Sequence, residues 1–281
     1  MNRRKLTVGI VLAASGACLA LAGLAAGIGA GSANAGITAR LPPAANDKVY
    51  GAPQARGRPI VVIDAGHGGS DPGAGSLTGA VNEKDLALDV ARDLRDLLVE
   101  RGRVRVAMTR NEDQYLGLDQ RAAVARRLNA ALFVSLHMDS APNPLARGAT
   151  VYSLSDVASD AESARLAAQE NHGAERGRGD DSNVGSILAD LAMRAQMTAS
   201  ADLASRLVAK SSGRFELRPQ PHRFAAFHVL RRADAPAVLF EAGYLSNAED
   251  ELLLRDSKHR HAITLALAEA IESDVAARSR R

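Results

Sequence analysis

Short, nearly continuous apolar runs alternate with helical patterns along most of this chain. The apolar runs lie at residues 59–64, 104–109, 131–136, 149–154, 227–230 and 237–240. Apolar residues recur with helical spacing at 83–100, 118–128, 186–212 and 263–275. A strand that is apolar on both faces needs cover on both faces. We therefore expect an α/β fold, in which a mostly parallel, twisted sheet carries helices on both faces of a single domain.

The first 35 residues differ in composition from the rest of the chain. Basic residues at positions 3–5 precede a long apolar and small-residue stretch, and residues 32–35 end in an A-x-A pattern. This order predicts a secretory signal cut after Ala35, and Arg3-Arg4 is compatible with twin-arginine export. An uncleaved anchor is the alternative, although so much Ala and Gly makes a weak membrane span. We expect export to the periplasm or cell envelope.

The charge balance depends on that segment. The chain has 35 Lys and Arg against 32 Asp and Glu, and residues 1–35 hold three of the basic residues and none of the acidic ones. The remaining chain is therefore neutral, so its basic pI does not predict binding to nucleic acid. The single cysteine, Cys18, lies in the same segment and excludes an internal disulfide. Residues 36–58 resemble a flexible lead-in, and residues 277–281 form a basic tail.

One segment, at about 156–184, interrupts the alternation of strands and helices. It begins with a charged, Ala-rich helical stretch at 157–169 and ends in a Gly-rich charged run at 173–181, which we expect to be mobile. Irregular segments of this length inside a compact domain are usually functional or disordered.

Four polar residues lie at places where an α/β sheet binds ligands. His67 follows the first strand, His137 ends the third and Glu241 ends the last, and ligands collect beyond the carboxyl ends of parallel strands. Glu83 opens the helix after a Gly-rich loop, on the face turned to the sheet. Two histidines and a carboxylate match a catalytic zinc site with an open position. A second carboxylate beside them suits a general base.

Each residue also has an ordinary explanation. Glu83 could complement the helix dipole, His137 could be a core histidine, His67 could be exposed, and Glu241 could be a solvated strand end. The Gly-rich loop could cradle a phosphate, but it lacks the G-x-G-x-x-G and Walker spacings. The four together favour a metal centre. We expect surface or packing roles for the other histidines, which are His172, His222, His228, His259 and His261.

Residues 63–74 closely resemble the opening motif of the zinc-dependent N-acetylmuramoyl-L-alanine amidases, the amidase_3 family. Segments resembling later family motifs follow in the same order: 82–85, Arg121 with Asn129, 132–137, 187–191 and 238–247. The resemblance covers about residues 59–276, the expected catalytic domain. It implies Zn²⁺ on His67, Glu83 and His137, with Glu241 as catalytic acid/base.

One departure from the family pattern follows the second histidine. The family commonly has a small residue and then Asn there, whereas this chain has Met138-Asp139. An acid at this position adds negative charge near the expected metal. Asp64 and Ser135 are candidates for groups that support the ligands from behind.

The resemblance implies hydrolysis of the amide bond between N-acetylmuramic acid and L-alanine of peptidoglycan, in cell-wall remodelling and daughter-cell separation. The 156–184 segment resembles the autoinhibitory helix of the cell-division amidases, where Glu170 or Glu175 could occupy the open metal position until an activator protein displaces it. A plain surface excursion is the alternative. The expected partners are peptidoglycan and that activator, with no nucleic acid and no stable membrane span after signal cleavage. A zinc peptidase of peptide cross-links and a non-catalytic peptidoglycan-binding protein remain competing functions.

Overall fold

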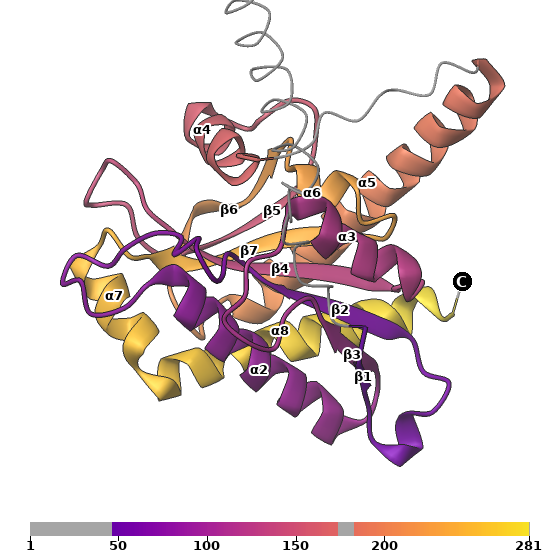
Figure 1. Ribbon diagram of the computed structural model, residues 1–281, viewed down its shortest axis with the longest axis horizontal. Coiled ribbons are helices and arrows are strands. Elements are labelled where there is room, and N and C mark those ends of the chain that lie inside the picture. The colour runs from indigo at the N-terminus through magenta and orange to yellow at the C-terminus, as the bar shows by residue number, and fades with distance from the viewer. Residues whose placement is uncertain (1–46, 174–182, 281) are drawn as a thin grey trace, which may run out of the picture. The chain divides into compact units, whose positions relative to one another are not determined.

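A twisted sheet forms the centre of the fold in the computed structural model, which describes residues 47–173 and 183–280. Within these residues the sheet has seven strands in the order β1-β3-β2-β4-β7-β5-β6 (Figure 1). The strands are β1 (Val49–Tyr50), β2 (Ile60–Ala65), β3 (Arg105–Met108), β4 (Leu132–Asp139), β5 (Ala149–Leu154), β6 (Leu217–Ala225) and β7 (Ala237–Tyr244). The four central strands β3, β2, β4 and β7 run parallel, while β5 is antiparallel to β7 and parallel to β6. The expected mostly parallel sheet is confirmed.

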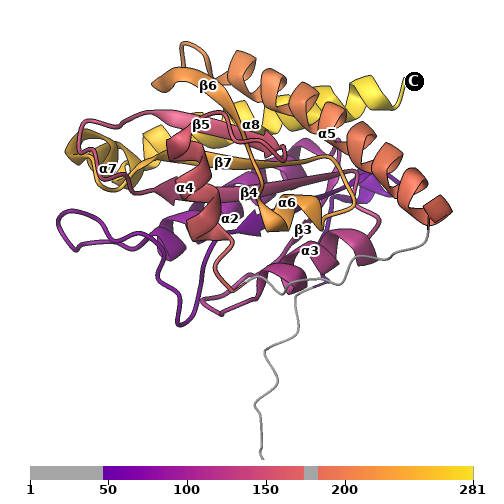
Figure 2. The same ribbon diagram turned by 90° about the horizontal axis from the view of Figure 1, so that it is seen from above.

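Helices cover both faces of the sheet, as the sequence predicts. They are α2 (Glu83–Arg101), α3 (Leu118–Arg127), α4 (Ala161–Glu170), α5 (Asn183–Ser211), α6 (His228–Arg231), α7 (Ala248–Arg255) and α8 (Ser257–Arg278). In Figure 1, α2 and α8 lie below the sheet, and α3, α4 and α6 lie above it. The C-terminal part of α5 packs beside α8, which Figure 2 shows from above.

The strand β2 illustrates why its sequence is apolar at nearly every position. Ile63 packs into the cluster formed with α2 and α8, whereas its neighbour Val62 packs into the cluster on the opposite face. Successive side chains of a strand point to opposite faces, so a strand covered on both faces buries all of them. The α2 helix that covers β2 ends at Gly102, whose backbone is left-handed and whose amide donates to the Leu98 carbonyl at 3.1 Å.

The expected strand at 227–230 is wrong. These residues lie in and next to the short helix α6, and the strand of this region is β6, which the apolar pattern did not indicate. β6 is an edge strand that contains Pro219 and Pro221 and leaves several positions exposed, so it has no continuous apolar run. Phe227 and Leu230 are buried because α6 packs on the sheet, which explains their strand-like signal.

The ends of the chain differ from the expectations in smaller ways. Part of the expected flexible lead-in is ordered, since Val49 of β1 pairs with Ala107 and a short 3-10 helix, η1 (Pro53–Ala55), follows. The helix α7 was not expected, and α8 begins at Ser257 rather than 263 because Asp256 caps it. The expected signal segment, most of the lead-in, Arg281 and residues 174–182 of the expected mobile run lie outside the described residues. No helix in the described part of the chain has the length and apolarity of a membrane span.

Candidate metal centre

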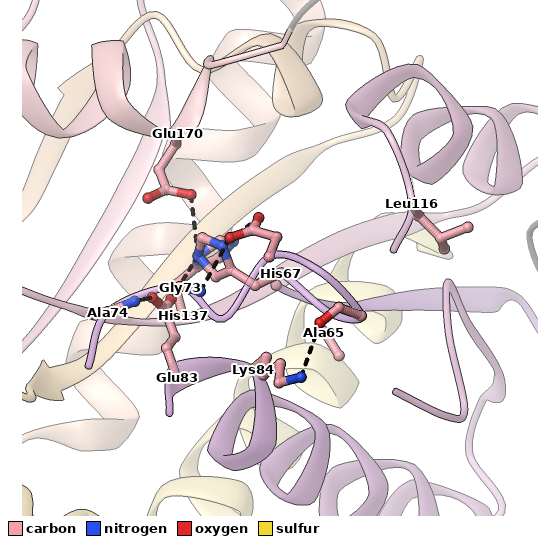
Figure 3. A network of polar contacts seen from close by, with 12 residues as sticks. Ala65, His67, Gly73, Ala74, Glu83, Lys84, Leu116, His137 and Glu170 are labelled. Carbon is pink, nitrogen blue, oxygen red and sulfur yellow. Dashed lines mark hydrogen bonds and ion pairs between the residues drawn. The ribbon is translucent and has the colours of Figure 1, made fainter. Parts of the chain in front are cut away.

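The site lies where β2 and β4 end. His67 stands two residues beyond β2, His137 is on β4, and Glu83 is the first residue of α2. On the neighbouring strand β7, Glu241 is directly opposite His137 in the strand register. Figure 3 shows the two imidazole rings and the Glu83 carboxylate gathered together. The topology thus brings three of the four predicted residues to one point and the fourth to the adjacent strand.

The three donor groups converge on one small volume. Glu83 Oε1 lies 3.1 Å from His67 Nε2 and 2.9 Å from His137 Nδ1. Donors bonded to one tetrahedral zinc ion at its usual bond lengths are separated by about 3.3 Å. His67 Nε2 is buried and makes no hydrogen bond, although Glu83 is close. A buried nitrogen that makes no hydrogen bond and lies close to the other donor atoms is suited to bind a metal ion.

The opposite nitrogen of His67 has the contact that a metal-binding histidine needs. Its Nδ1 donates a hydrogen bond to Asp71 Oδ2 at 2.9 Å. The lone pair of Nε2 is then the one that can bind a cation. Burial alone would lower the pKa of His67, but the facing Glu83 and the hydrogen bond to Asp71 raise it to about 11. The carboxylates that face His67 thus favour a positive charge at this position. The same negative environment attracts a metal cation.

The Glu83 carboxylate is fixed by two backbone amides as well as by the rings. Ala74 N donates to Oε2 at 2.8 Å, and Met138 N donates to Oε1 at 3.0 Å. Burial favours its neutral form, but His67 and His137 outweigh burial and hold the pKa of the Glu83 carboxyl well below its usual range. Glu83 therefore stays ionised. Its burial beside the sheet exceeds what a helix-dipole role would require.

Two glycines permit the close packing of the donors. A Cβ atom on Gly66 would lie 2.5 Å from His137 Cε1. Gly73 has a φ of +66°, and a Cβ there would lie 2.5 Å from Glu83 Oε2. The Gly-rich loop is therefore a consequence of close contact with the donor side chains, and no phosphate cradle is needed to explain it.

A buried network holds the loop that carries His67, which itself has a left-handed φ of 56°. Arg121 donates to the carbonyl oxygens of Ala65 and His67, both at 2.6 Å, and to Asp64 Oδ1 at 2.9 Å. Arg110 donates to the carbonyl oxygens of Ala65 and Gly66 at 2.9 and 2.8 Å. Two buried guanidinium groups thus fix three successive carbonyl groups of the loop.

Asp64 completes this network from the end of β2. Its carboxylate accepts hydrogen bonds from Thr109 and Ser135, both at 2.7 Å, in addition to Arg121. Burial would raise the pKa of Asp64, but Arg121 and the two hydroxyl groups lower it overall. Asp64 and Ser135 therefore support the site through Arg121 and the β2–β4 pair.

Glu241 and Asp139 are two buried acids beside the donor group. Both oxygens of Glu241 are buried without a hydrogen bond, and so is Asp139 Oδ2. Burial raises the pKa of Glu241 well above its usual range, and the nearby charge of Asp139 raises it further. Burial likewise raises the pKa of Asp139 to about 6. A carboxyl group that holds a proton near neutral pH can act as both acid and base.

Helix α4 brings a further carboxylate to the site. Glu170, its last residue, places Oε2 at 3.4 Å from His137 Nδ1 and 3.6 Å from His67 Nε2. Figure 3 shows it approaching the rings from the side opposite Glu83. His67, His137 and Glu170 form a group whose donor atoms all lie within 4.8 Å of one another. Of the two glutamates considered for this place, Glu175 lies outside the described residues.

A cleft of about 440 Å³ opens beside these residues. Its walls combine Asp71 and Glu170 with the apolar side chains of Leu118, Phe227 and Val229. His172, for which we expected a surface role, also lines this cleft. His222 instead lies 2.8 Å from Ser153 Oγ and packs against Phe224.

An α/β sheet with two histidines and a carboxylate gathered beside its strand ends fits the class of hydrolases that use a metal ion. The chain belongs to the family of N-acetylmuramoyl-L-alanine amidases (Amidase_3), which it matches over residues 61–273. This match confirms the family resemblance of the motifs.

Individual relatives agree with the family assignment. AmiC of Neisseria meningitidis serogroup B is 35% identical over 220 residues, which are 76% of this chain and 52% of that protein. AmiA of Escherichia coli K12 is 34% identical over 222 residues, which are 77% of this chain and 76% of that protein. Both are named N-acetylmuramoyl-L-alanine amidases. The chain thus spans about half the length of the Neisseria relative.

A solved structure shows the same fold. The catalytic domain of CwlV, an N-acetylmuramoyl-L-alanine amidase from Bacillus (Paenibacillus) polymyxa var. colistinus, matches with a TM-score of 0.57 at 27% identity. The match covers 76% of this chain and 97% of that domain.

The site contains residues that the sequence reasoning did not select. Asp71, Arg110 and Arg165 each contact a group of the site or its supporting loop. Asp71 lies within the opening motif, so its spacing of four residues from His67 was an available signal. The two arginines carried no signal, because a long basic side chain after a strand or within a helix is usually exposed.

Proposed function

We propose that this chain is a zinc-dependent N-acetylmuramoyl-L-alanine amidase that hydrolyses the amide bond between N-acetylmuramic acid and L-alanine in peptidoglycan. The observation that carries the proposal is the convergence of His67 Nε2, Glu83 Oε1 and His137 Nδ1 on one small volume, where His67 Nε2 is buried and makes no hydrogen bond. These three residues would hold the zinc ion. The substrate follows from the family, and the chemistry follows from the donor set.

Zinc supplies an acidified water and a polarised carbonyl group when it is bound. Glu241 accepts a proton from the attacking water and then donates one to the leaving nitrogen, which would otherwise depart as a poor amide anion. Its burial suits both steps, because a raised pKa lets the carboxyl group hold the proton between them. Glu83 stays ionised throughout and serves as a ligand rather than as the base.

Helix α4 acts as an autoinhibitory segment in this proposal. The Glu170 carboxylate lies 3.4 and 3.6 Å from the two histidine nitrogens, where a substrate oxygen would need to enter. Activation therefore requires α4 to move, and we propose that an activator protein displaces it. Replacement of Glu170 by Ala should raise basal hydrolysis of purified sacculi, whereas Glu249→Ala, which removes a surface partner of Arg147, should leave it unchanged. An unchanged rate in the zinc-loaded Glu170→Ala protein would count against autoinhibition.

The cellular setting is part of the proposal. A signal at residues 1–35 would deliver the enzyme to the periplasm or cell envelope, where peptidoglycan lies. We propose a role in cell-wall remodelling and daughter-cell separation. The division of the chain into signal, lead-in, catalytic domain at 59–276 and basic tail stays a prediction.

Release of dye from labelled sacculi tests the mechanism. Glu241→Gln should retain zinc, measured by elemental analysis, and lose at least about 100-fold in rate. Chelated protein should lose activity and regain it when zinc is returned. Mass spectrometry of the products separates the alternatives, because an amidase frees intact stem peptides and a cross-link peptidase does not. Sustained release by Glu241→Gln would overturn the catalytic assignment.

A further inference from the structure

Two buried acids, Asp139 and Glu241, lie beside the donor group and are not among the proposed metal ligands. Asp139 is two residues beyond His137 on β4, and its side chain is completely buried. Its Oδ1 accepts from Ser140 N at 2.5 Å, while Oδ2 has no hydrogen bond. Glu241, whose two oxygens also make no hydrogen bond, is on β7, the strand paired with β4. Asp139 Oδ2 and both oxygens of Glu241 are thus buried acceptors without a donor, which a cationic donor would satisfy.

Helix α4 supplies that cation in this state of the protein. Arg165 Nη2 lies 3.7 Å from Asp139 Oδ1 and donates to the Ser140 carbonyl at 3.1 Å. The same helix places Glu170 at the histidines, one turn further on. The single helix therefore sets a carboxylate against the donor group and a guanidinium against Asp139. When α4 leaves, both charges leave together, and Asp139 loses its counter-ion.

The unpaired atoms around this position are suited to an amine. Thr150 Oγ1 and Tyr152 OH on β5 are buried and have no hydrogen bond in the described structure. Thr150 is opposite Glu241 in the strand register. Carboxylate and hydroxyl oxygens accept hydrogen bonds, and a primary ammonium group has three donors to give them. The guanidinium of Arg165 thus occupies the place where a smaller cation of the substrate, a primary ammonium group, would bind.

We propose that Asp139 forms a cation subsite beside Glu241, that Arg165 occupies it in the closed state, and that it binds a primary ammonium group of the stem peptide once α4 has moved. This inference rests on the proposed function for the identity of the peptide. Two amines could supply the group. One is the α-amine of L-alanine that hydrolysis sets free, and the other is the side-chain amine of a diamino acid further along the peptide.

Binding of a defined peptide to the full-length, zinc-loaded protein tests this subsite without relying on turnover. The probes are L-alanyl-γ-D-glutamyl-L-lysine and its two mono-acetylated forms, one blocked at the α-amine and one at the lysine side chain. Isothermal titration calorimetry gives their affinities. Arg165→Ala should bind the free peptide about tenfold more tightly than the wild type, because it removes both the competing cation and the contacts of Arg165 that hold α4 at Asp139 and Ser140.

The matched control is Arg231→Ala, since Arg231 pairs with Asp156 and has the same exposed fraction as Arg165, 35%. It should leave the affinity unchanged. In the Arg165→Ala background, the peptide whose critical amine is acetylated should lose at least about tenfold, and the acetylated form that loses it identifies the amine. Asp139→Asn in the same background should abolish the gain, with zinc content confirmed for each variant.

The proposed subsite would be ruled out if Arg165→Ala bound all three peptides with equal affinity, and this result does not depend on whether Asp139→Asn retains zinc. It would also be ruled out if Arg165→Ala and Arg231→Ala bound the free peptide with the same affinity. Failure of the proposed function gives a different result, namely amine-dependent peptide binding without release of dye from sacculi. Conversely, release of dye with no effect of Arg165 on peptide affinity would leave the amidase function standing and remove the subsite.

Discussion

The donor group and the helix that covers it are held by different kinds of contact. The loop carrying His67 is fixed by Arg110 and Arg121, both buried and both donating to several carbonyl groups. Helix α4 is held by ion pairs of Glu162 with Arg218 and Arg223 and by Leu166 and Ala167, which pack in the apolar cluster on that face of the sheet. Buried charge pairs are costly to break, whereas exposed pairs contribute little. These α4 contacts do not involve the loop that carries His67, so in the proposed opening α4 would move while the donor group keeps its geometry.

The largest effect is expected from Arg121→Ala. This change leaves Asp64 buried without its counter-ion and removes the donor to the Ala65 and His67 carbonyl groups. Loss of one partner of a buried pair costs about 3–5 kcal/mol of unfolding free energy. Urea unfolding of the metal-free protein measures it. Arg126→Ala on the same helix should cost much less, since Arg126 lies exposed. Equal losses would contradict the contrast between donor group and cover.

A smaller loss is expected from Asp64→Asn, and it should depend on pH. The lowered pKa of Asp64 means that its carboxylate stabilises the folded state above its ordinary pKa of 3.8, and that this stabilisation is lost as pH falls through the lower folded value. The variant should be about 1–3 kcal/mol less stable than the wild type near neutral pH. That difference should shrink as unfolding is measured below pH 3.8. A difference independent of pH would show that the charge of Asp64 is not the cause.

Gly73→Ala tests the packing of the donors directly. Its backbone is left-handed, which costs an L-residue about 1–2 kcal/mol, and its Cβ would meet Glu83 Oε2. Gly79 has nearly the same φ, +68° against +66°, but open space around it. Gly79→Ala therefore carries the strain without the collision. We expect a larger stability loss for Gly73→Ala than for Gly79→Ala, and weaker zinc binding for Gly73→Ala alone, measured by competition with a chromophoric chelator. Equal zinc affinities would mean that Glu83 does not need this close contact.

The sequence was sufficient for the donor group because its residues are placed by simple rules. Apolar runs identified β2, β4 and β7, and parallel strands bring their carboxyl ends together, so His67, His137 and Glu241 were expected near one another. The turn of α2 toward the sheet placed Glu83 with them. These residues depend on local patterns and on a topology that such patterns determine.

The sequence was insufficient where placement depends on tertiary contacts. The sequence could not decide whether Glu170 or Glu175 approaches the two histidines, because contacts with residues distant in the sequence determine where α4 ends. The side chain of Asn171 donates to the Ala226 carbonyl and accepts from His228 N, both at 2.7 Å. Arg165 and Arg110 reach their partners through long side chains, which no periodicity reveals. The strand β6 has no apolar run because it lies at the edge of the sheet, pairs with one neighbour only and buries few of its side chains.

The smallest effect on stability, and a visible effect on activity, is expected from Glu162→Gln. The change weakens the pairs with Arg218 and Arg223 that hold the start of α4, and it should cost about 1 kcal/mol or less because Glu162 is partly exposed and Gln can still accept a hydrogen bond from both arginines. If that energy holds the cover closed, the open population and the basal hydrolysis of sacculi should rise up to about fivefold. Glu249→Gln, which weakens a surface pair with Arg147, should change neither. A basal rate that stays level in Glu162→Gln, at full zinc content, would mean that these pairs do not hold the cover. The contrast between a rigid donor group and a releasable helix would then have to rest on Arg165 and Asn171.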